Sequence, residues 1–539
     1  MEAWDILVIG DGPAALRSAA QSAKHGAKTL LISSSALGGS DNSAIDGLAA
    51  SIQEMNNRGH REDTIKSGYF LCDQDIVSSK TSSAIDEMNH LEKAGVVFSR
   101  DPKGLPSTHK GIGHSSPRLV DAGDASVRDI QQVLEEQCMK HGVVRRSDQL
   151  PVMLVETNHK VDGVITLDMV NGQFIAIQTK AVIIADGGYE GLFQGTAIGF
   201  GTDLALQAGM PLRGMEFIAK TPLGVANSKL NISSSILGYG ANLYNTSGDT
   251  LSADTMTDLC EVVLESGPAV LDGRDMGDNK IWWDSVFRTV KSATGVDMDK
   301  FTIGLENRVN QTIGGIPTDE HGRAVIGSWS RWFTGLYAAG DSACSGLNGA
   351  GTLPGNRLLD SLSGGNNAGT HAAEWVQSQS FANTDNLVNA LQKCVDNTHA
   401  AGGEETTETV RRIGSIDSKL LEIATKFTSG ANSAEELSNY LAELSAAAEL
   451  AQSIHLDQTS LIANTNLVAK HRIQAGIRLL TCSIRASIAR NESRGVHQRT
   501  DFKDENPELI HHITVDNEGN IGTLAVRKGQ KDNWVLPPQ

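Results

Sequence analysis

Three small residues near the N-terminus have the spacing of a turn that binds a dinucleotide. They are Gly10, Gly12 and Ala15, in the stretch "VIGDGPAALRSA". The first glycine permits a tight turn, the second lets the backbone approach a pyrophosphate, and the small third residue lets a helix pack on a strand. The pyrophosphate then lies against amides at the helix N-terminus, where the helix dipole is positive. The pattern therefore predicts a bound dinucleotide.

The elements around this turn have the pattern of a βαβ unit. "WDILVIG" is an apolar run of strand length, "DGPAALRSAAQSAKHG" is an alanine-rich helix that stops at a glycine, and "AKTLLIS" is a second strand. The crossover between the strands should be right-handed. The second strand normally ends in an acid that binds a ribose hydroxyl. Here it ends at Ser33, whose hydroxyl can still donate and accept, so the site is weakened but not excluded.

A second glycine–acid turn, far along the chain, distinguishes a flavin from a nicotinamide cofactor. It contains Gly340 and Asp341 in "GLYAAGDSA", and an NAD site is normally complete within one Rossmann domain. A chain that returns in this way holds the far end of a longer cofactor. Asp341 can accept hydrogen bonds from the ribityl hydroxyls of FAD. A helix beginning near Asn356 would direct its positive end at the flavin pyrimidine.

Composition excludes several other classes of protein. The 539 residues are enough for two or three domains, and the net charge of −18 without clustered Lys and Arg argues against nucleic-acid binding. The six cysteines are far apart, so we expect reduced, buried thiols and no metal or iron–sulfur site supplied by this chain alone. Neither a signal peptide nor an apolar run of membrane-spanning length is evident, so a cytoplasmic protein is expected.

Five segments, in order, resemble the succinate dehydrogenase/fumarate reductase flavoprotein family. "DILVIGDGPAALRSA" resembles its nucleotide turn, "IADGGYEG" its ATGG turn, and "NESRGVHQRTDF" its ESRGAHxRxDF element. The most specific matches are "GGIPTDEHGR" and "GLYAAGDSACSGLNGAGTLPGNRLLDSLSGGNNAG". A serine at the position of Ser33 is usual in the succinate dehydrogenase branch. The resemblance covers nearly the whole chain and implies an FAD-dependent oxidoreductase.

The resemblance also implies which residues contact FAD. In the family, a Ser-His-Thr segment carries the histidine that binds FAD covalently, and here Ser40, Asp41 and Asn42 occupy its place. The carboxylate of Asp41 cannot replace the histidine nitrogen that forms this bond, so we predict non-covalent FAD. The alternative is that this loop is a solvated hinge. The residues expected to bind the cofactor are Gly10, Gly12, Pro13, Ala14, Ala15, Ser33, Ser40, Asp41, Asn42, Gly47, Asp186, Gly187, Gly188, Gly340, Asp341, Asn356, Arg357 and Leu358.

The residues that the family uses on dicarboxylates are not retained. Two carboxylates need cationic partners, and an arginine then moves the proton. The two family histidines are replaced by Thr221 in "KTPLG" and Asn310 in "NQTIGGIPT". The two arginines are replaced by Glu265 in "EVVLESG" and Thr352 in "GAGTLPGN". A glutamate at an arginine position would repel a dianion, so succinate or fumarate turnover is disfavoured.

Three cations are candidate substitutes: Lys220, Arg213 and Arg357. Arg357 stands where the family has a serine beside the flavin pyrimidine, where a guanidinium would stabilise reduced flavin. A surface or helix-end charge is the alternative for each of them, and a solvated helix residue is the alternative for Glu265. Phe200 stands at the family's TGDG aspartate on the FAD side. The residues at catalytic positions are thus Thr221, Glu265, Asn310, Thr352 and Arg357.

We therefore expect an α/β protein with a Rossmann-like FAD-binding domain, an inserted α+β capping domain, a helical domain and a small C-terminal β region. The expected bounds are 1–217 and 307–370 for the FAD-binding domain, 218–306 for the capping domain, 371–500 for the helical domain and 501–539 for the β region.

Three functions are compatible with these features. The first is an FAD-dependent oxidoreductase subunit that passes electrons between a small organic substrate, other than a plain dicarboxylate, and an iron–sulfur partner. The second is a true succinate dehydrogenase flavoprotein with a remodelled site. The third is a catalytically silent structural flavoprotein. The resemblance implies membrane contact only through partner subunits, at the inner face of the cell membrane.

Overall fold

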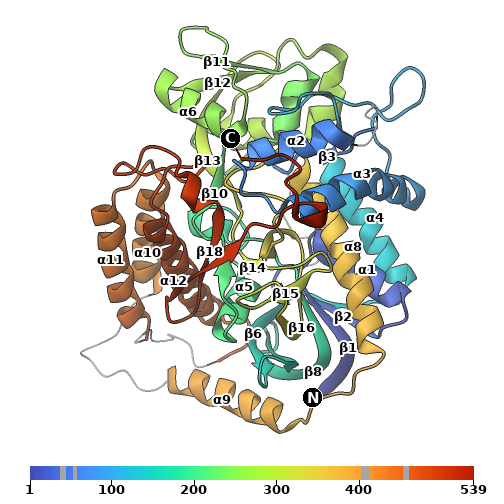
Figure 1. The fold of residues 1–539 in the computed structure, drawn as a ribbon, viewed down its shortest axis with the longest axis vertical. Helices are drawn as coiled ribbons and strands as arrows, with labels where there is room; N and C mark the ends of the chain where they lie inside the picture. Colours follow the sequence, from blue (N-terminus) through green and yellow to red (C-terminus); the bar gives the residue numbers. More distant parts are fainter. Residues whose placement is uncertain (37–43, 53–56, 402–412, 453, 455–459, 539) are drawn as a thin grey trace.

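The computed structural model describes residues 1–36, 44–52, 57–401, 413–452, 454 and 460–538. Its centre is a mixed eight-stranded sheet (Figure 1). In sheet order the strands are β15 (Arg323–Val325), β16 (Trp332–Ala338), β8 (Gln173–Ile184), β1 (Glu2–Ile9), β2 (Thr29–Ile32) and β5 (Val144–Arg146), with β7 (Val161–Asp168) beside β8 and β6 (Gln149–Glu156) beside β7. The strands from β16 to β5 run parallel, as expected for an α/β fold.

The register of the parallel strands places several turns at one edge of the sheet. Ile9 of β1 lies opposite Ile32 of β2 and Ile184 of β8, and Ala338 of β16 is also opposite Ile184. All four strands thus end at the same level. The turns that follow them meet at the carboxyl edge of the sheet, which is where open α/β sheets bind ligands.

The predicted βαβ unit is confirmed. Helix α1 (Pro13–Lys24) joins β1 to β2, and it packs on the long helix α8 (Asn356–Val376). Two glycines of α8 allow this approach, because a Cβ on Gly365 would lie 2.6 Å from the Ala14 oxygen and one on Gly369 would lie 2.4 Å from the Ser18 oxygen. The close packing fixes the N-terminal ends of both helices at the same edge of the sheet.

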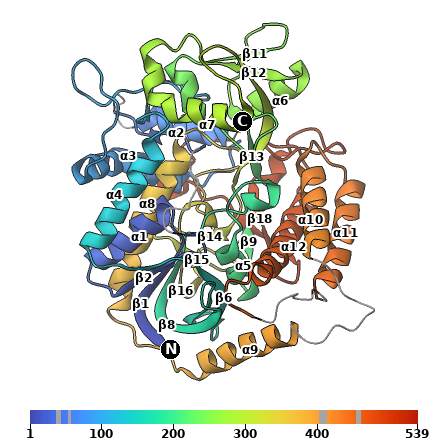
Figure 2. The ribbon, with the colours of Figure 1, turned by 180° about the vertical axis from the view of Figure 1, so that it is seen from behind.

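Further helices and short strands complete this part of the molecule. Helices α3 and α4 lie beside α1 and α8 (Figure 2). The elements are α2 (Arg58–Ser67), α3 (Gln74–Ala94), α4 (Ser126–Lys140), α5 (Phe200–Gln207), β3 (Leu48–Ala49), β4 (Leu119–Val120), β14 (Ile316–Pro317) and β17 (Ala343–Cys344). The apolar faces of α1, α3, α4 and α8 and one face of the sheet form a buried core around Ile6, Leu16 and Leu359.

A second sheet forms a cap with its own core. Its order is β10 (Ile218–Val225), β13 (Ile303–Thr312), β12 (Ala269–Asp272) and β11 (Asn242–Asn245), all antiparallel. Helices α6 (Met256–Ser266) and α7 (Asp284–Thr294) and the 3-10 helix η3 (Ser234–Tyr239) cover it, around the fully buried Trp283. Two bulges interrupt the pairing of β10 with β13 close to Thr221, which re-aims side chains there.

Helices follow α8 along the chain. Those between residues 413 and 489 lie on the side of the main sheet away from α8, and the helix at residues 385–401 packs on β6, β7 and β8 (Figures 1 and 2). They are α9 (Asp385–Ala401), α10 (Ile413–Thr428), α11 (Ala434–Gln452) and α12 (Thr465–Ala489). Strand β18 (His511–Val515) then pairs with β19 (Ile521–Ala525) on one side and with β9 (Leu212–Arg213) on the other. Of the helices in the described part of the chain, none has the length and apolar character to cross a membrane. The predicted α/β fold with a cap and a helical region is confirmed.

The C-terminal segment returns to the start of α3. The side chain of Gln74 accepts hydrogen bonds from the amides of Val535 and Leu536, at 2.6 and 2.9 Å, and donates one to the Leu536 oxygen at 2.7 Å. Next to it, the fully buried carboxylate of Asp73 binds Arg213 and His512, at 2.9 and 3.0 Å. The last residues thus close the fold onto its N-terminal part.

Candidate cofactor and substrate site

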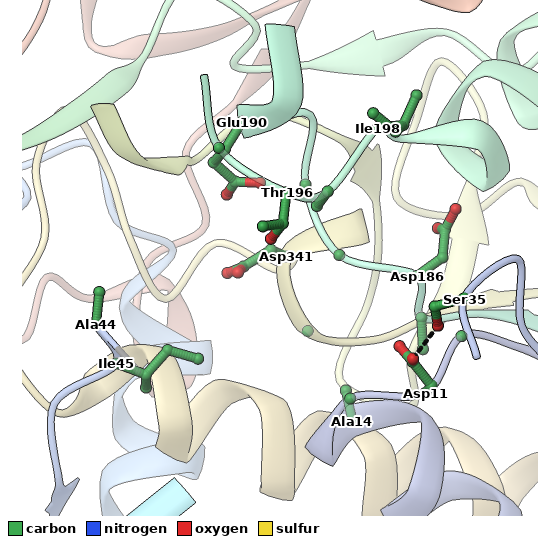
Figure 3. Close-up of a pocket in the computed structure, with 18 of the residues that line it drawn as sticks. Asp11, Ala14, Ser35, Ala44, Ile45, Asp186, Glu190, Thr196, Ile198 and Asp341 are labelled. Carbon is green, nitrogen blue, oxygen red and sulfur yellow. Dashed lines mark hydrogen bonds between the residues drawn. The ribbon is translucent and has the colours of Figure 1, made fainter. Parts of the chain in front are cut away.

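A cavity of about 490 Å³ lies at the carboxyl edge of the main sheet (Figure 3). The turns after β1, β2, β8 and β16 line it, together with residues 229–231 and 308–310 of the cap. Its volume is in the range of cofactor sites, and it lies where the register of the strands predicts one.

The glycine turn after β1 has the geometry that a bound pyrophosphate requires. Gly10 has a φ of +135°, and a Cβ there would lie 2.1 Å from the Ala185 oxygen. No side chain caps the N-terminus of α1, and Gly12, Pro13 and Ala14 line the cavity. The turn and the helix end therefore fit a dinucleotide. Ala15, which was also expected to bind it, is instead packed in the core behind the turn.

Two features weaken this phosphate site. Pro13 is the first residue of α1, where its ring suits the helix but supplies no N–H to a phosphate. The carboxylate of Asp11 lines the same cavity and accepts a hydrogen bond from the Ser35 hydroxyl. Ser33 also lines the cavity, and its hydroxyl donates to the Ser35 oxygen at 3.0 Å. The contacts to the phosphates must therefore come mainly from backbone amides.

Asp186 supports the turn that follows β8. Its carboxylate accepts hydrogen bonds from the Gly201 amide at 2.7 Å and from the Ser342 hydroxyl at 3.1 Å. Burial raises the pKa of Asp186 to about 6, against the opposing effect of these hydrogen bonds. The adjacent Gly187 and Gly188 line the cavity, and so does Phe200 at the start of α5. The carboxyl thus joins three of the elements around the cavity.

Asp341, which follows β16, is held by two side chains of the protein. It accepts hydrogen bonds from Gln311 Nε2 at 2.7 Å and from Arg357 Nε at 2.6 Å. The preceding Gly340 has a φ of +64°, and a Cβ there would lie 2.8 Å from the Cβ of Ala14. The turn is therefore packed against α1, and its carboxylate faces the cavity (Figure 3).

Arg357 also binds Glu190, a residue that sequence reasoning did not single out. Its Nη1 donates to the Asn310 oxygen at 2.9 Å, and its Nη2 donates to Glu190 Oε1 at 3.3 Å. The same Oε1 accepts the Thr312 amide at 3.1 Å. Burial raises the pKa of Glu190 to about 7, although Arg357 lowers it. The available signal was an acid two residues after the glycine pair of "IADGGYEG".

A second cavity, of about 30 Å³, adjoins the first and shares Ala44, Ile45, Asn310 and Arg357 with it. It brings together four of the five residues at catalytic positions, which are Thr221, Asn310, Thr352 and Arg357. The residues at catalytic positions thus meet beside the main cavity, around a space of about one water molecule.

The remaining candidate charges lie elsewhere or are bound. Glu265 is exposed in the last turn of α6 and lines neither of these two cavities. Arg213 is fully buried in its pair with Asp73. Lys220 lines the small cavity, but its ammonium donates to the Thr428 oxygen at the end of α10, and burial lowers its pKa.

Other residues that were predicted to contact the cofactor make contacts within the protein. The side chain of Asn356 is buried and bonded to His60 and Thr64, so it anchors the start of α8. Leu358 is buried in the core. The Gly47 amide donates to Ser235 of the cap at 3.3 Å. Ser40, Asp41 and Asn42 lie outside the described residues.

No group of three or more His, Cys, Asp or Glu among the described residues could hold a metal ion. All six cysteines are buried and free of disulfides.

A glycine turn at the carboxyl edge of a parallel sheet, a returning acid turn and a cap over the cavity define a flavoprotein of the FAD-dependent oxidoreductase class. Comparison with known families agrees: the model for an FAD binding domain matches residues 5–358, and the model for the fumarate reductase flavoprotein C-terminus matches residues 418–537. The chain belongs to the succinate dehydrogenase/fumarate reductase flavoprotein family.

Relatives of this chain match over almost its whole length. The succinate dehydrogenase flavoprotein subunit of Rickettsia conorii is 28% identical, over 96% of this chain and 94% of the relative. The fumarate reductase flavoprotein subunit of Escherichia coli is 27% identical, over 99% and 95%.

Two solved structures extend the comparison. A mutant of E. coli quinol fumarate reductase FrdA superposes with a TM-score of 0.90 at 23% identity, covering 100% of this chain and 99% of that one. Adenylylsulfate reductase from Archaeoglobus fulgidus has a TM-score of 0.77 at 15% identity, covering 99% and 97%. At these identities the likeness concerns the fold alone.

Proposed function

We propose that this protein is an FAD-dependent oxidoreductase subunit that transfers electrons between a small organic substrate, other than a plain dicarboxylate, and an iron–sulfur partner. One observation carries the choice of substrate. Of the described residues that line the small cavity, the cations are Lys220 and Arg357, and oxygen atoms of the protein already bind both. Among these described residues, a dianion in the small cavity would therefore find no cation that is not already bound.

Electrostatics makes a dianion still less favourable there. Arg357 is flanked by the carboxylates of Asp341 and Glu190, so its charge is already balanced. Bringing two further carboxylates into this buried region would require their desolvation without a compensating charge. A neutral substrate, in contrast, can form hydrogen bonds with the side chains of Thr221, Asn310 and Thr352. The substitutions at the family's catalytic positions thus favour a changed substrate.

The cofactor would be held by residues already in place. Gly10, Gly12 and the amides of α1 would bind the pyrophosphate, Asp341 the ribityl hydroxyls, and the N-terminus of α8 would face the flavin. FAD, when bound, supplies a two-electron acceptor beside the small cavity. The chain itself contributes orientation, exclusion of water by the cap, and the charge of Arg357.

Two comparisons bear on the wider proposal. The relatives are named as subunits, which supports a partner for this chain, and an iron–sulfur protein is the partner that the family resemblance implies. Membrane association would then arise through partners, at the inner face of the cell membrane. The similar fold of adenylylsulfate reductase is compatible with a substrate outside the dicarboxylates, because the fold alone does not determine the substrate.

The test is the visible spectrum of the purified holoprotein under anaerobic conditions. We expect no bleaching of the flavin band on addition of succinate, and full bleaching by dithionite as the control. Bleaching by succinate would contradict the proposal and favour the second candidate, a succinate dehydrogenase flavoprotein with a remodelled site, which the 28% identity over 96% of the chain supports.

Non-covalent binding of FAD gives a separate prediction. Because Asp41 stands at the position of the family's flavin-linking histidine, denaturation of the holoprotein should release the flavin into the supernatant. Acid precipitation followed by absorbance of pellet and supernatant measures this, and the mass of the intact chain should equal that of the sequence. Flavin that stays with the pellet would show a covalent bond.

A further inference from the structure

A buried cluster of two carboxyls and one guanidinium lies on the wall of the main cavity. Glu190 comes from the 3-10 helix η2 (Glu190–Phe193), Asp341 from the 3-10 helix η5 (Gly340–Ser342), and Arg357 from the first turn of α8. Their side chains are 7%, 11% and 18% exposed. Figure 3 shows the carboxyls of Glu190 and Asp341 on the same side of the cavity. When all three groups are ionised, the cluster has a net charge of −1.

The space for Glu190 is made by two glycines. A Cβ on Gly188 would lie 2.7 Å from Glu190 Oε1 and 2.9 Å from Oε2. A Cβ on Gly195 would lie 2.7 Å from the Cβ of Glu190. A larger residue at either position would displace the side chain. The two glycines thus leave space for the side chain of Glu190 at the wall of the cavity.

The contacts decide which of the two carboxyls can take up a proton. Asp341 uses both oxygens, one for Gln311 and one for the short bond to Arg357. In Glu190, Oε1 accepts the longer bond from Arg357 and the Thr312 amide. The charged groups that face Glu190 are therefore Arg357 from α8 and Asp341 from η5, while strand β13 presents a backbone amide. Glu190 Oε2 is the atom where a proton would be added.

Resting on the proposed function, we propose that Glu190 is the proton-accepting residue of the site: it binds a proton from solvent when the cofactor in this cavity gains electrons. Negative charge on the reduced cofactor, beside Arg357, would partly offset the positive charge of the guanidinium. The Glu190 carboxylate then loses part of its stabilisation and binds one H⁺ at Oε2, while Arg357 keeps its own proton. The electron pair comes from the substrate, or from dithionite in the test, and reoxidation returns the proton to solvent.

The experiment measures the midpoint potential of the holoprotein against pH on either side of pH 7, near the pKa of Glu190. On reduction by two electrons, the wild-type protein should bind as much as one proton more than Glu190→Gln in this range. Equal pH slopes for the two proteins would overturn the proposal. Dithionite as reductant makes the result independent of the substrate, and a protein without a flavin spectrum would instead show that the proposed function fails.

Infrared difference spectra provide a second readout that a purely structural role would not change. Reduction should produce the band of a protonated carboxyl, which Glu190→Gln should lack and the control Asp360→Asn should keep. Asp360 is also buried, but it pairs with Lys80 and does not line the main cavity. If Glu190→Gln fails to hold FAD, isotope-labelled glutamate in the wild-type protein decides: a band that does not shift would exclude Glu190.

Discussion

Replacement of Gly10 by alanine is expected to produce a protein that no longer retains FAD through purification. The new Cβ would lie 2.1 Å from the Ala185 oxygen and 2.9 Å from the Asp186 amide, and the residue would keep a φ of +135°. The strain of such a conformation alone costs about 1–3 kcal/mol. Relief of the clash must move the turn that contacts the pyrophosphate, so affinity should fall by more than about tenfold, or about 1.4 kcal/mol. Fluorescence titration of apoprotein with FAD measures the change.

The matched control is Gly26→Ala, on the turn after the same helix. Gly26 also has a positive φ, of +88°, but a Cβ there meets nothing within 4 Å. This variant should be slightly less stable and should bind FAD like the wild type. Circular dichroism shows whether Gly10→Ala remains folded. A folded Gly10→Ala protein with full FAD content would refute the proposed place of the pyrophosphate.

Asp73→Asn is expected to lower the free energy of unfolding by about 3–5 kcal/mol, since it removes one partner from a buried charge cluster. Arg213 and Asp73 are both fully buried, at a distance of 2.9 Å, and His512 Nε2 lies 3.0 Å from the other carboxylate oxygen. The amide of Arg527 also donates to Asp73, at 2.8 Å. Asparagine keeps the shape but leaves the guanidinium of Arg213 without a counter-charge. Urea unfolding measures the loss.

An exposed ion pair supplies the control for Asp73. Asp299, which pairs with Lys280 at 2.9 Å and is 57% exposed, should lose at most about 1 kcal/mol on replacement by asparagine. The two substitutions are chemically the same, so the difference reports burial. Similar small losses for both would show that the cluster around Asp73 does not hold the C-terminal segment in place.

The pH dependence of this cluster has a definite sign. Burial raises the pKa of Asp73, but His512 and Arg213 outweigh it and hold the pKa well below its usual value of 3.8. A carboxyl with a lowered pKa stabilises the fold above its unfolded pKa, and this contribution is lost as the pH falls through the folded value. The wild-type protein should therefore lose its advantage over Asp73→Asn in acid below about pH 4.

Local patterns predicted the frame of the site well. The turn at Gly10, the βαβ unit around it and the helix that begins at Asn356 were all predicted, because each depends on short-range spacing and apolar periodicity. The residues at catalytic positions were identified from the family resemblance. The structure brings Thr221, Asn310 and Thr352 together at the small cavity. Their catalytic roles, the domain bounds and the contact of Asp41 with FAD remain predictions.

The parts that sequence reasoning missed depend on long-range pairing. Glu190 and Arg357 are 167 residues apart, and Lys220 and Thr428 are 208 residues apart, so no local pattern relates them. Glu190, Arg357 and Lys220, each taken alone, have the properties of ordinary surface charges. Only the fold shows that Arg357 is shared between two carboxyls and that the Lys220 ammonium binds a helix end.

The contact between Gln74 and the C-terminal segment has a consequence for how the chain is made. The hydrogen bonds from Val535 and Leu536 span 461 and 462 residues, and the bond from Arg527 to Asp73 spans 454. At about 5–20 residues per second, a ribosome would need at least some tens of seconds to supply the partners of residues that emerged early. Until then Asp73 has neither Arg527 nor His512. The N-terminal part therefore lacks these contacts until residues 512–536 have been synthesised, and a nascent chain that stops before them would not reach the stability of the folded protein.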